Sequence, residues 1–435
     1  MRMNRRTFLI GTAAMAVTAG AGAYVWPEQG LFNPCKAAMP PQLTNHELVR
    51  AAREGIDAAR VWDCHVHLIG IGDSSSGVWI NPRMQSWAHP LEFAQRLFFL
   101  NAGCARETAG QVDTSYVERM RNLVAGLAPG AKLMLLAFDF THDQAGERQP
   151  ARSAFHTPDS YAHGLAQAHP RDFEWIASIH PYRRDCVAAL EWAAGNGARA
   201  VKWLPPAMGI DPASARCDRF YAAAARLGLA LLTHAGEEKA VHGAAEHGFG
   251  NPLKLRRALD HGMRVVVAHC ASLGQDIDLD RGENGPATES FDLFARLMDD
   301  PGYVGRVYGD ISAIAQVNRS AAALRHIVER ADWHSRLLNG SDYPLPGVMP
   351  LISVNRVIDL GLLERAAGPV LMEIRAHNPL LFDFVLKRLL RAGGKRLAPS
   401  AFHTRDFFLA QPPRSSAEAE RAAERSALFE RRRVS

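Results

Sequence analysis

Eight short apolar runs alternate with segments of helical periodicity between residues 60 and 342 of this 435-residue chain. The segments between them, such as Asp185–Ala194, Ala213–Leu227 and Arg319–Ala331, repeat apolar residues at helical spacing. Strands that alternate with helices form a parallel sheet, and eight such units predict a (β/α)8 TIM barrel. The eight runs are Arg60–Leu68, Lys132–Phe140, Phe173–His180, Arg199–Leu204, Leu229–His234, Arg264–Cys270, Tyr303–Ile311 and Arg336–Asp342.

The size of the chain suits one large domain with appendages. With 47% hydrophobic residues it can bury an extensive core. A doubly wound open sheet is the competing fold, but no Gly-x-Gly-x-x-Gly follows an early strand. We predict an N-terminal extension over residues 24–57, an α/β barrel over 58–390 and a charged C-terminal tail over 391–435.

The net charge of +5 is unevenly distributed along the chain. Arg2, Arg5 and Arg6 lie in the first six residues, and the segment from Arg414 to Ser435 holds six arginines against four glutamates. These ends account for the whole surplus, so the body is neutral. A neutral body argues against a nucleic-acid partner, which requires a clustered basic surface.

The first residues have the pattern of an export signal. Residues 4–10, Asn-Arg-Arg-Thr-Phe-Leu-Ile, resemble the twin-arginine signal, and an uncharged stretch rich in Gly, Ala and Thr follows up to Trp26. Cleavage after Ala23 would remove residues 1–23 and release the protein to the periplasm or the medium. If the segment stays attached, it is long enough to anchor the protein in a membrane. The export machinery is thus an expected partner.

Six cysteines are scattered along the chain, and no Cys-x-x-Cys pair occurs among them. An oxidising compartment would permit disulfides, but the spacing fits neither a zinc ribbon nor a disulfide scaffold. The pairing is not assigned by the sequence. The six are Cys35, Cys64, Cys104, Cys186, Cys217 and Cys270.

A His-x-His motif closes the first apolar run. In a strand, side chains two apart point to the same face, so His65 and His67 can both point into the mouth of the barrel and share one metal ion. Cys64 and Val66 are then expected to face outward to the helices.

Three later runs also deliver a possible metal ligand at their carboxyl ends. His234 ends the fifth run, His269 lies near the end of the sixth, and Asp342 ends the eighth. Imidazole and carboxylate are ligands for divalent transition metals. A lone histidine at such a place is more often packed or solvated, and Asp342 could be a turn residue before Pro344. Their repeated position at strand ends favours one shared site.

This ordered set resembles the amidohydrolase superfamily of metal-dependent hydrolases, in particular the amidohydrolase-2 branch, which also holds non-oxidative decarboxylases. The family pattern is His-x-His on the first strand, His on the fifth and sixth, and Asp on the eighth. The matching residues are His65, His67, His234, His269 and Asp342. Asn378–Phe382 also resembles the family's closing helix start, and the resemblance covers roughly residues 58 to 390.

The resemblance implies a divalent metal ion, Zn²⁺ in the first place and Mn²⁺ or Fe²⁺ as alternatives. Four side chains would hold it: His65, His67, His234 and Asp342. His269 would be catalytic by polarising the substrate carbonyl, or would bind a second ion. Lys202 lies where some members carry a carbamylated lysine that bridges two ions; unmodified, it would pair with a carboxylate or the substrate. One or two ions are expected.

The expected activity is the hydrolysis of an amide, ester or lactone bond in a small molecule. Asp342 would take a proton from the attacking water and return it to the leaving group. The alternative is decarboxylation, with Asp342 protonating a ring carbon, and a non-catalytic barrel is a weaker alternative. His180 and Arg183, after the third strand, are candidates for binding a substrate carboxylate.

Two long connections and the tail complete the expectations. Gly70–His89 and Thr141–Thr157 follow the first two strands, and loops there lie on the catalytic face of a barrel. They are expected to form the walls and lid of the substrate pocket. Ser415–Arg433 alternates Glu and Arg with alanines, which predicts a solvated helix; the alternatives are a disordered segment and one that docks on another subunit of a homo-oligomer.

Overall fold

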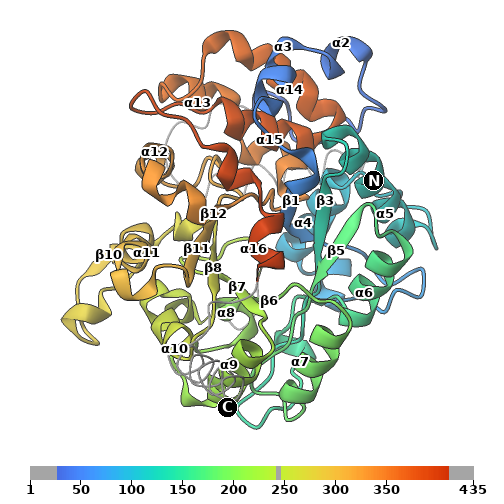
Figure 1. Ribbon diagram of the computed structural model, residues 1–435. Helices are drawn as coiled ribbons and strands as arrows, with labels where there is room; N and C mark the ends of the chain where they lie inside the picture. Colours follow the sequence, from blue (N-terminus) through green and yellow to red (C-terminus); the bar gives the residue numbers. More distant parts are fainter. Residues whose placement is uncertain (1–26, 242–245, 411–435) are drawn as a thin grey trace, which may run out of the picture.

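The computed structural model describes residues 27–241 and 246–410 (Figure 1). The predicted signal at 1–23 and the tail segment Ser415–Arg433 lie outside the described residues. Each predicted apolar run contains one strand of a parallel barrel, which confirms the predicted α/β fold. The eight strands are β1 (Trp62–His67), β3 (Lys132–Leu136), β5 (Phe173–Ile176), β6 (Ala200–Trp203), β7 (Ala230–His234), β8 (Val265–Ala268), β11 (Val307–Asp310) and β12 (Leu337–Leu338).

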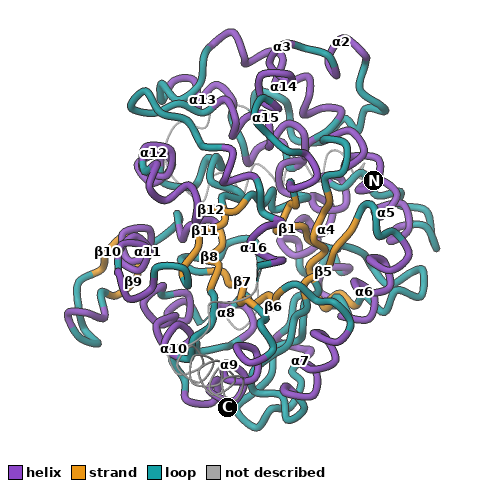
Figure 2. Tube along the Cα trace, viewed as in Figure 1, coloured by secondary structure: helices purple, strands orange, loops and turns teal. Residues whose placement is uncertain are grey.

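The eight strands follow one another in chain order as two parallel ladders. One ladder holds β1, β3 and β5, and the other holds β6, β7, β8, β11 and β12. Parallel bridges join the ladders at both seams, between Ala177 and Val201 at one and between Val66 and Tyr343 at the other. Figure 2 shows the resulting ring of strands with helices outside it.

The first strand contains a β-bulge that places its side chains. The register of β1 against β3 shifts between Asp63 and Val66. Val66 packs in the outer core against the helices, as predicted. Cys64 packs instead in the inner cluster beside Met134, so the prediction that it faces outward was wrong. The period of two fails here because Cys64 and His65 together lie opposite one residue of β3.

The helices of the barrel units surround the ring, and those from the chain ends gather beside β1 and β12 (Figure 1). The three helical segments predicted between strands each contain a helix, namely α7, α9 and α12, and the last two helices are shorter than predicted. No helix in the described ranges has the length and apolar character needed to cross a membrane. The helices of the barrel units are α4 (Pro90–Ala102), α5 (Val112–Leu127), α6 (Asp159–Ala168), α7 (Cys186–Gly195), α8 (Pro205–Met208), α9 (Asp218–Arg226), α10 (Arg256–Asp260), α11 (Ser290–Asp299) and α12 (Ala321–Glu329). The others are α2 (Pro41–Thr44), α3 (Glu47–Arg53), α13 (Val354–Asp359), α14 (Gly368–His377), α15 (Pro379–Leu389) and α16 (Arg405–Leu409).

The two long connections pair with each other. β2 (Trp79–Ile80) in the first and β4 (Phe155–His156) in the second form an antiparallel ladder. A second small ladder joins β9 (Gln275–Ile277) to β10 (Ala287–Glu289) after the sixth barrel strand. Because β2 pairs with β4, the two long connections form one continuous structure at the carboxyl-terminal end of the barrel.

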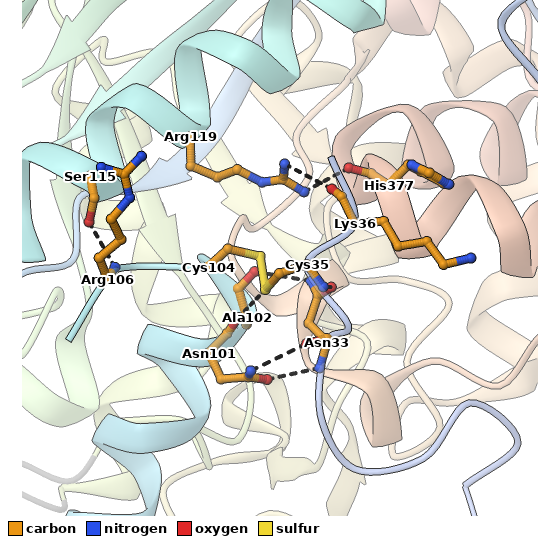
Figure 3. The surroundings of a disulfide bond; sticks show 10 residues. All are labelled: Asn33, Cys35, Lys36, Asn101, Ala102, Cys104, Arg106, Ser115, Arg119 and His377. Carbon is orange, nitrogen blue, oxygen red and sulfur yellow. Dashed lines mark hydrogen bonds between the residues drawn. A yellow bond between two sulfur atoms is a disulfide. The ribbon is translucent and has the colours of Figure 1, made fainter. Parts of the chain in front are cut away.

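The N-terminal extension is fastened to the end of α4. Cys35 and Cys104 form a disulfide, a pairing that the sequence did not assign (Figure 3). Beside it, Asn33 N donates to Asn101 Oδ1 at 2.8 Å. The extension is thus tied to the helix that follows the first long connection.

The end of the barrel at which the strands begin, opposite the two long connections, is closed by α16. Phe407 and Phe408 pack in the inner cluster below the strand starts, and Arg264 donates to Phe407 O at 2.8 Å. Figure 1 shows α16 in front of the centre of the ring. The described part of the predicted tail, residues 391–410, therefore packs against the barrel.

Candidate metal centre

Five predicted ligands lie together at the carboxyl-terminal ends of the strands. His65 and His67 lie on β1, His234 is the last residue of β7, His269 directly follows β8, and Asp342 follows β12. Because parallel strands all end at the same rim of a barrel, residues far apart in sequence converge there. All five residues line one cavity, and the donor atoms of His65, His67 and Asp342 are close enough together to hold one ion.

Asp342 is at the centre of this group. Its Oδ1 lies 3.1 Å from His67 Nε2 and 3.5 Å from His65 Nε2, and its Oδ2 lies 3.7 Å from His269 Nε2. The ring of His234 is next to that of His269, with centroids 5.5 Å apart. Two donors bound to one tetrahedral zinc ion are about 3.4 Å apart, given bond lengths near 2.1 Å. The distances from Asp342 to His65 and His67 match that spacing.

His65 is oriented by a buried carboxylate that the sequence did not reveal. Its Nδ1 lies 2.7 Å from Asp310 Oδ2, and the other oxygen of Asp310 accepts from Ser312 N at 2.7 Å and from the Ser312 hydroxyl. Nδ1 therefore carries the hydrogen, and Nε2 presents a lone pair toward Asp342. The Lys202 ammonium lies 3.2 Å from the same Nε2.

His269 has the same tautomer for a similar reason. Its Nδ1 lies 3.1 Å from the carbonyl oxygen of Ser312, which can only accept a hydrogen. Nε2 is then an acceptor as well. The backbone is left-handed at His269 (φ 56°) and Asp342 (φ 61°). Such a conformation costs about 1–3 kcal/mol for a residue other than glycine and tends to occur at functional sites.

His234 presents a buried lone pair without a hydrogen-bond partner. Its Nε2 lies 3.2 Å from the carbonyl oxygen of Glu237 and donates to it. Nδ1 has no hydrogen bond and faces the Glu238 carboxylate, with Oε2 3.3 Å away. Two acceptors at that distance repel each other unless a cation lies near both. This arrangement fits a bound metal ion.

The protonation states suit metal binding as well. Burial lowers the pKa of His65 to about 4 and lowers the pKa of His234 and His269, so all three imidazoles are neutral at pH 7. Burial alone would raise the pKa of Asp342, but charge attraction from His269 and His65, when these rings are protonated at low pH, and the hydrogen bond with His67 hold it well below 3.8. Neutral imidazoles and an ionised carboxylate are the forms that bind a metal.

The five candidate ligands line a cavity at the barrel mouth. Its walls come from both long connections, which supply Val78, Ile80 and Phe155, and from α4, which supplies Phe99. The predicted role of the two connections as pocket walls is confirmed by this lining. Small-molecule sites are typically mostly apolar cavities with a few convergent polar groups.

The family of the chain follows from a comparison with known families. Residues 62–351 match the model of the amidohydrolase family. The chain belongs to the amidohydrolase family. The match spans every strand of the barrel and all five candidate ligands. No curated protein matches the sequence significantly.

Several solved structures are similar to this amidohydrolase at low identity. One is an uncharacterised TIM-barrel protein from Bordetella bronchiseptica (16% identity, 69% of this chain and 98% of that chain, TM-score 0.42). Another is a probable 2-pyrone-4,6-dicarboxylic acid hydrolase from Acinetobacter baumannii (13%, 73% and 96%, 0.40). A third is a 5-carboxyvanillate decarboxylase from Sphingomonas paucimobilis (12%, 73% and 96%, 0.39). Identities this low leave the substrate open.

His180 and Arg183 do not reach the cavity of this amidohydrolase. His180 is fully buried, its Nε2 lies 3.0 Å from Met208 O, and burial lowers its pKa to about 3. Arg183 forms ion pairs with Asp139 at 2.9 Å and with Asp185 at 2.7 Å. Neither residue lines the cavity. Their contacts give them a structural role and no support to the predicted binding of a substrate carboxylate.

The sequence analysis missed three groups near the ligands. Asp310 could have been found, because it is the last residue of β11 and the candidate ligands also lie at strand ends. Glu238 and Arg319 lie on loops behind β7 and β11, where no periodic pattern gives their direction. These loops supply much of the polar lining of the cavity.

Proposed function

We propose that this amidohydrolase is a metal-dependent hydrolase that cleaves an amide, ester or lactone bond of a small molecule. One observation supports this most directly: the ionised Asp342 carboxylate, buried at the cavity floor, lies 3.1 Å from His67 and among three further imidazoles. The Asp342 carboxylate is a proton acceptor at pH 7. Hydrolysis begins with the removal of a proton from water.

We propose that His65, His67, His234 and Asp342 hold the ion, with zinc as the first choice for such nitrogen and oxygen ligands. A bound divalent ion would supply a water of lowered pKa and polarise a substrate carbonyl. Asp342 accepts the proton from the attacking water and gives it to the leaving group. The lone pair on His269 Nε2 favours a ligand role over polarisation of a carbonyl, which needs a donor.

The number of ions depends on Lys202. Two ions require a carbamylated Lys202, and an unmodified ammonium leaves room for one. Metal analysis of the purified protein, prepared with and without bicarbonate, distinguishes these states: two zinc ions per chain that depend on bicarbonate indicate carbamylation, and one ion independent of bicarbonate indicates the free amine.

The activity test compares two panels of compounds with the zinc-loaded protein and with Asp342→Asn. The first panel holds lactones, esters and amides, and the second holds hydroxybenzoates. We expect turnover in the first panel, with incorporation of solvent ¹⁸O, and its loss in Asp342→Asn. Release of carbon dioxide without addition of water would establish the decarboxylase alternative. Failure to bind any metal would indicate a non-catalytic barrel.

We propose that the protein is exported by the twin-arginine route. Residues 4–10 support this, and so does the Cys35–Cys104 disulfide, because disulfides persist in oxidising compartments. Cell fractionation of the protein and of an Arg5→Lys, Arg6→Lys variant tests the proposal. The variant should stay in the cytoplasm, and an unchanged distribution would contradict the twin-arginine route.

A further inference from the structure

Two buried polar side chains on one cavity wall have atoms without partners. Arg319 and Gln316 lie on the loop after β11 and line the cavity that holds the ligands. Their exposed fractions are 7% and 4%. Arg319 Nε and Gln316 Nε2 have no hydrogen-bond partner. Both atoms are donors, and no group in the described part of the chain accepts a hydrogen bond from them.

The Arg319 guanidinium also lacks a direct counterion. In the described part of the chain no carboxylate lies within ion-pair distance of it, and its side chain donates a long hydrogen bond of 3.4 Å to Ser272 Oγ. Asp342 and Glu238 attract it at longer range. Burying an arginine without a paired anion is costly, so natural proteins usually pair such a group.

The loop that carries these side chains is held in place. Arg356 donates to Gln316 O at 3.3 Å and to Arg319 O at 3.1 Å. Behind the loop, Val317 N donates to Leu351 O at 2.9 Å and Ser320 N to the Ser272 carbonyl. A backbone fixed by several bonds holds its side-chain donors ready for a ligand, which reduces the entropy lost on binding.

We propose that Arg319 and Gln316 form the binding site for a carboxylate of the substrate, which makes the substrate a small organic acid. The planar guanidinium fork matches a carboxylate in two-point contact, and the Gln316 amide can donate a further hydrogen bond. Leu204, Val241 and Leu273 line the same cavity and offer apolar surface to the body of the acid. The identification of this acid as the substrate rests on the proposed function, because the reacting bond must then lie at Asp342.

Binding of a model acid can be measured apart from catalysis. Benzoate and benzamide have nearly the same shape, and only benzoate carries a charge. Their dissociation constants are measured by ligand-observed NMR on the full protein, both zinc-loaded and metal-free. We expect benzoate to bind about tenfold or more tightly than benzamide in both states. If the preference for benzoate is found only in the zinc-loaded protein and is lost in the metal-free protein, the metal binds the carboxylate, and the proposal is overturned.

Substitutions test whether Arg319 and Gln316 are the residues that bind the carboxylate. Arg319→Gln should abolish the preference for benzoate, and Gln316→Leu should reduce it, while both keep the zinc content of the wild type. Arg96→Gln is the matched control, because Arg96 lines the same cavity but donates to Met84 O and lies over Phe93. An equal loss in Arg96→Gln would indicate general electrostatic attraction and would refute the site.

The binding experiment tests the acid site independently of the proposed hydrolysis. If Arg319→Gln fails to fold, Gln316→Leu and the comparison of benzoate with benzamide in the wild type still decide. A preference for benzoate in a protein without hydrolytic activity would support the acid site and refute the hydrolase. Hydrolysis of neutral esters, with no preference for benzoate, would support the hydrolase and refute the acid site.

Discussion

Replacement of Asp310 by asparagine should weaken zinc binding although Asp310 is not a predicted ligand. Asp310 Oδ2 accepts from His65 Nδ1 at 2.7 Å, and both side chains are at most 1% exposed. Asparagine has nearly the same shape, but its NH₂ group can turn toward Nδ1 and move the imidazole hydrogen to Nε2. A His65 with hydrogen on Nε2 has no lone pair for the ion. Even with the tautomer preserved, loss of the charge weakens the ligand.

The expected loss is about 10- to 100-fold in zinc affinity, as is typical for removal of the group that orients a metal-binding histidine. This corresponds to about 1.4–2.7 kcal/mol. Competition with a chromophoric chelator measures the dissociation constant. Asp276→Asn is the control, because Asp276, on β9, accepts a hydrogen bond from Ser290 and does not line the cavity. Zinc binding as tight in Asp310→Asn as in the wild type, at equal thermal stability, would refute the orienting role.

Three further perturbations have outcomes set by local geometry. Gly340→Ala would place a methyl group 2.8 Å from His65 Cβ, so we expect a loss of about 1–3 kcal/mol in the free energy of unfolding, measured with urea, and weaker zinc binding; wild-type values would contradict the close contact. Replacing Cys35 and Cys104 by serine should lower the free energy of unfolding by up to about 4 kcal/mol, since the disulfide closes a loop with a separation of 69 residues, and dithiothreitol should reproduce the loss in the wild type but not in the variant. Burial lowers the pKa of His180 to about 3. Below pH 6.5 the unfolded chain therefore binds a proton at His180, whereas the folded protein binds it only near pH 3. The stability of the metal-free wild type relative to His180→Gln should therefore fall by about 2 kcal/mol between pH 7.5 and pH 5, and a pH-independent difference between the two urea curves would show that His180 has the same pKa in the folded and the unfolded protein.

The order of the strands and the ligands on them was predictable because both depend on local pattern. A run such as Arg264–Cys270 has an apolar centre, Val265–Ala268, and a parallel barrel brings the ends of all such runs to one rim. His269 could therefore be assigned to the same site as His65 although 204 positions separate them. The bulge in β1 was not predictable, since an extra residue in one strand leaves no mark in the hydrophobic pattern.

Groups on loops could not be assigned in the same way. Glu238 and Arg319 reach the cavity through loops whose course depends on tertiary contacts, such as the hydrogen bonds from Arg356 to the backbone of the Arg319 loop. The Cys35–Cys104 pair is similar, because either cysteine could have met any of the other four. Such contacts become determined only when the strands have placed the loops.

His180 and Asp342 show that a polar residue at the end of a predicted run does not always reach the site. Both end a predicted run, and each lies four residues after the last residue of its strand, β5 or β12. The chain at Asp342 still bonds to the neighbouring strand, with Asp342 N donating to His65 O at 2.8 Å, so its side chain stays at the rim. At His180 the backbone N–H donates instead to the side chain of Asp139 at 3.0 Å, because the chain has already left the barrel wall. For these two residues the apolar run gave the position along the chain, and the backbone bonds beyond the strand decided whether the side chain reached the site.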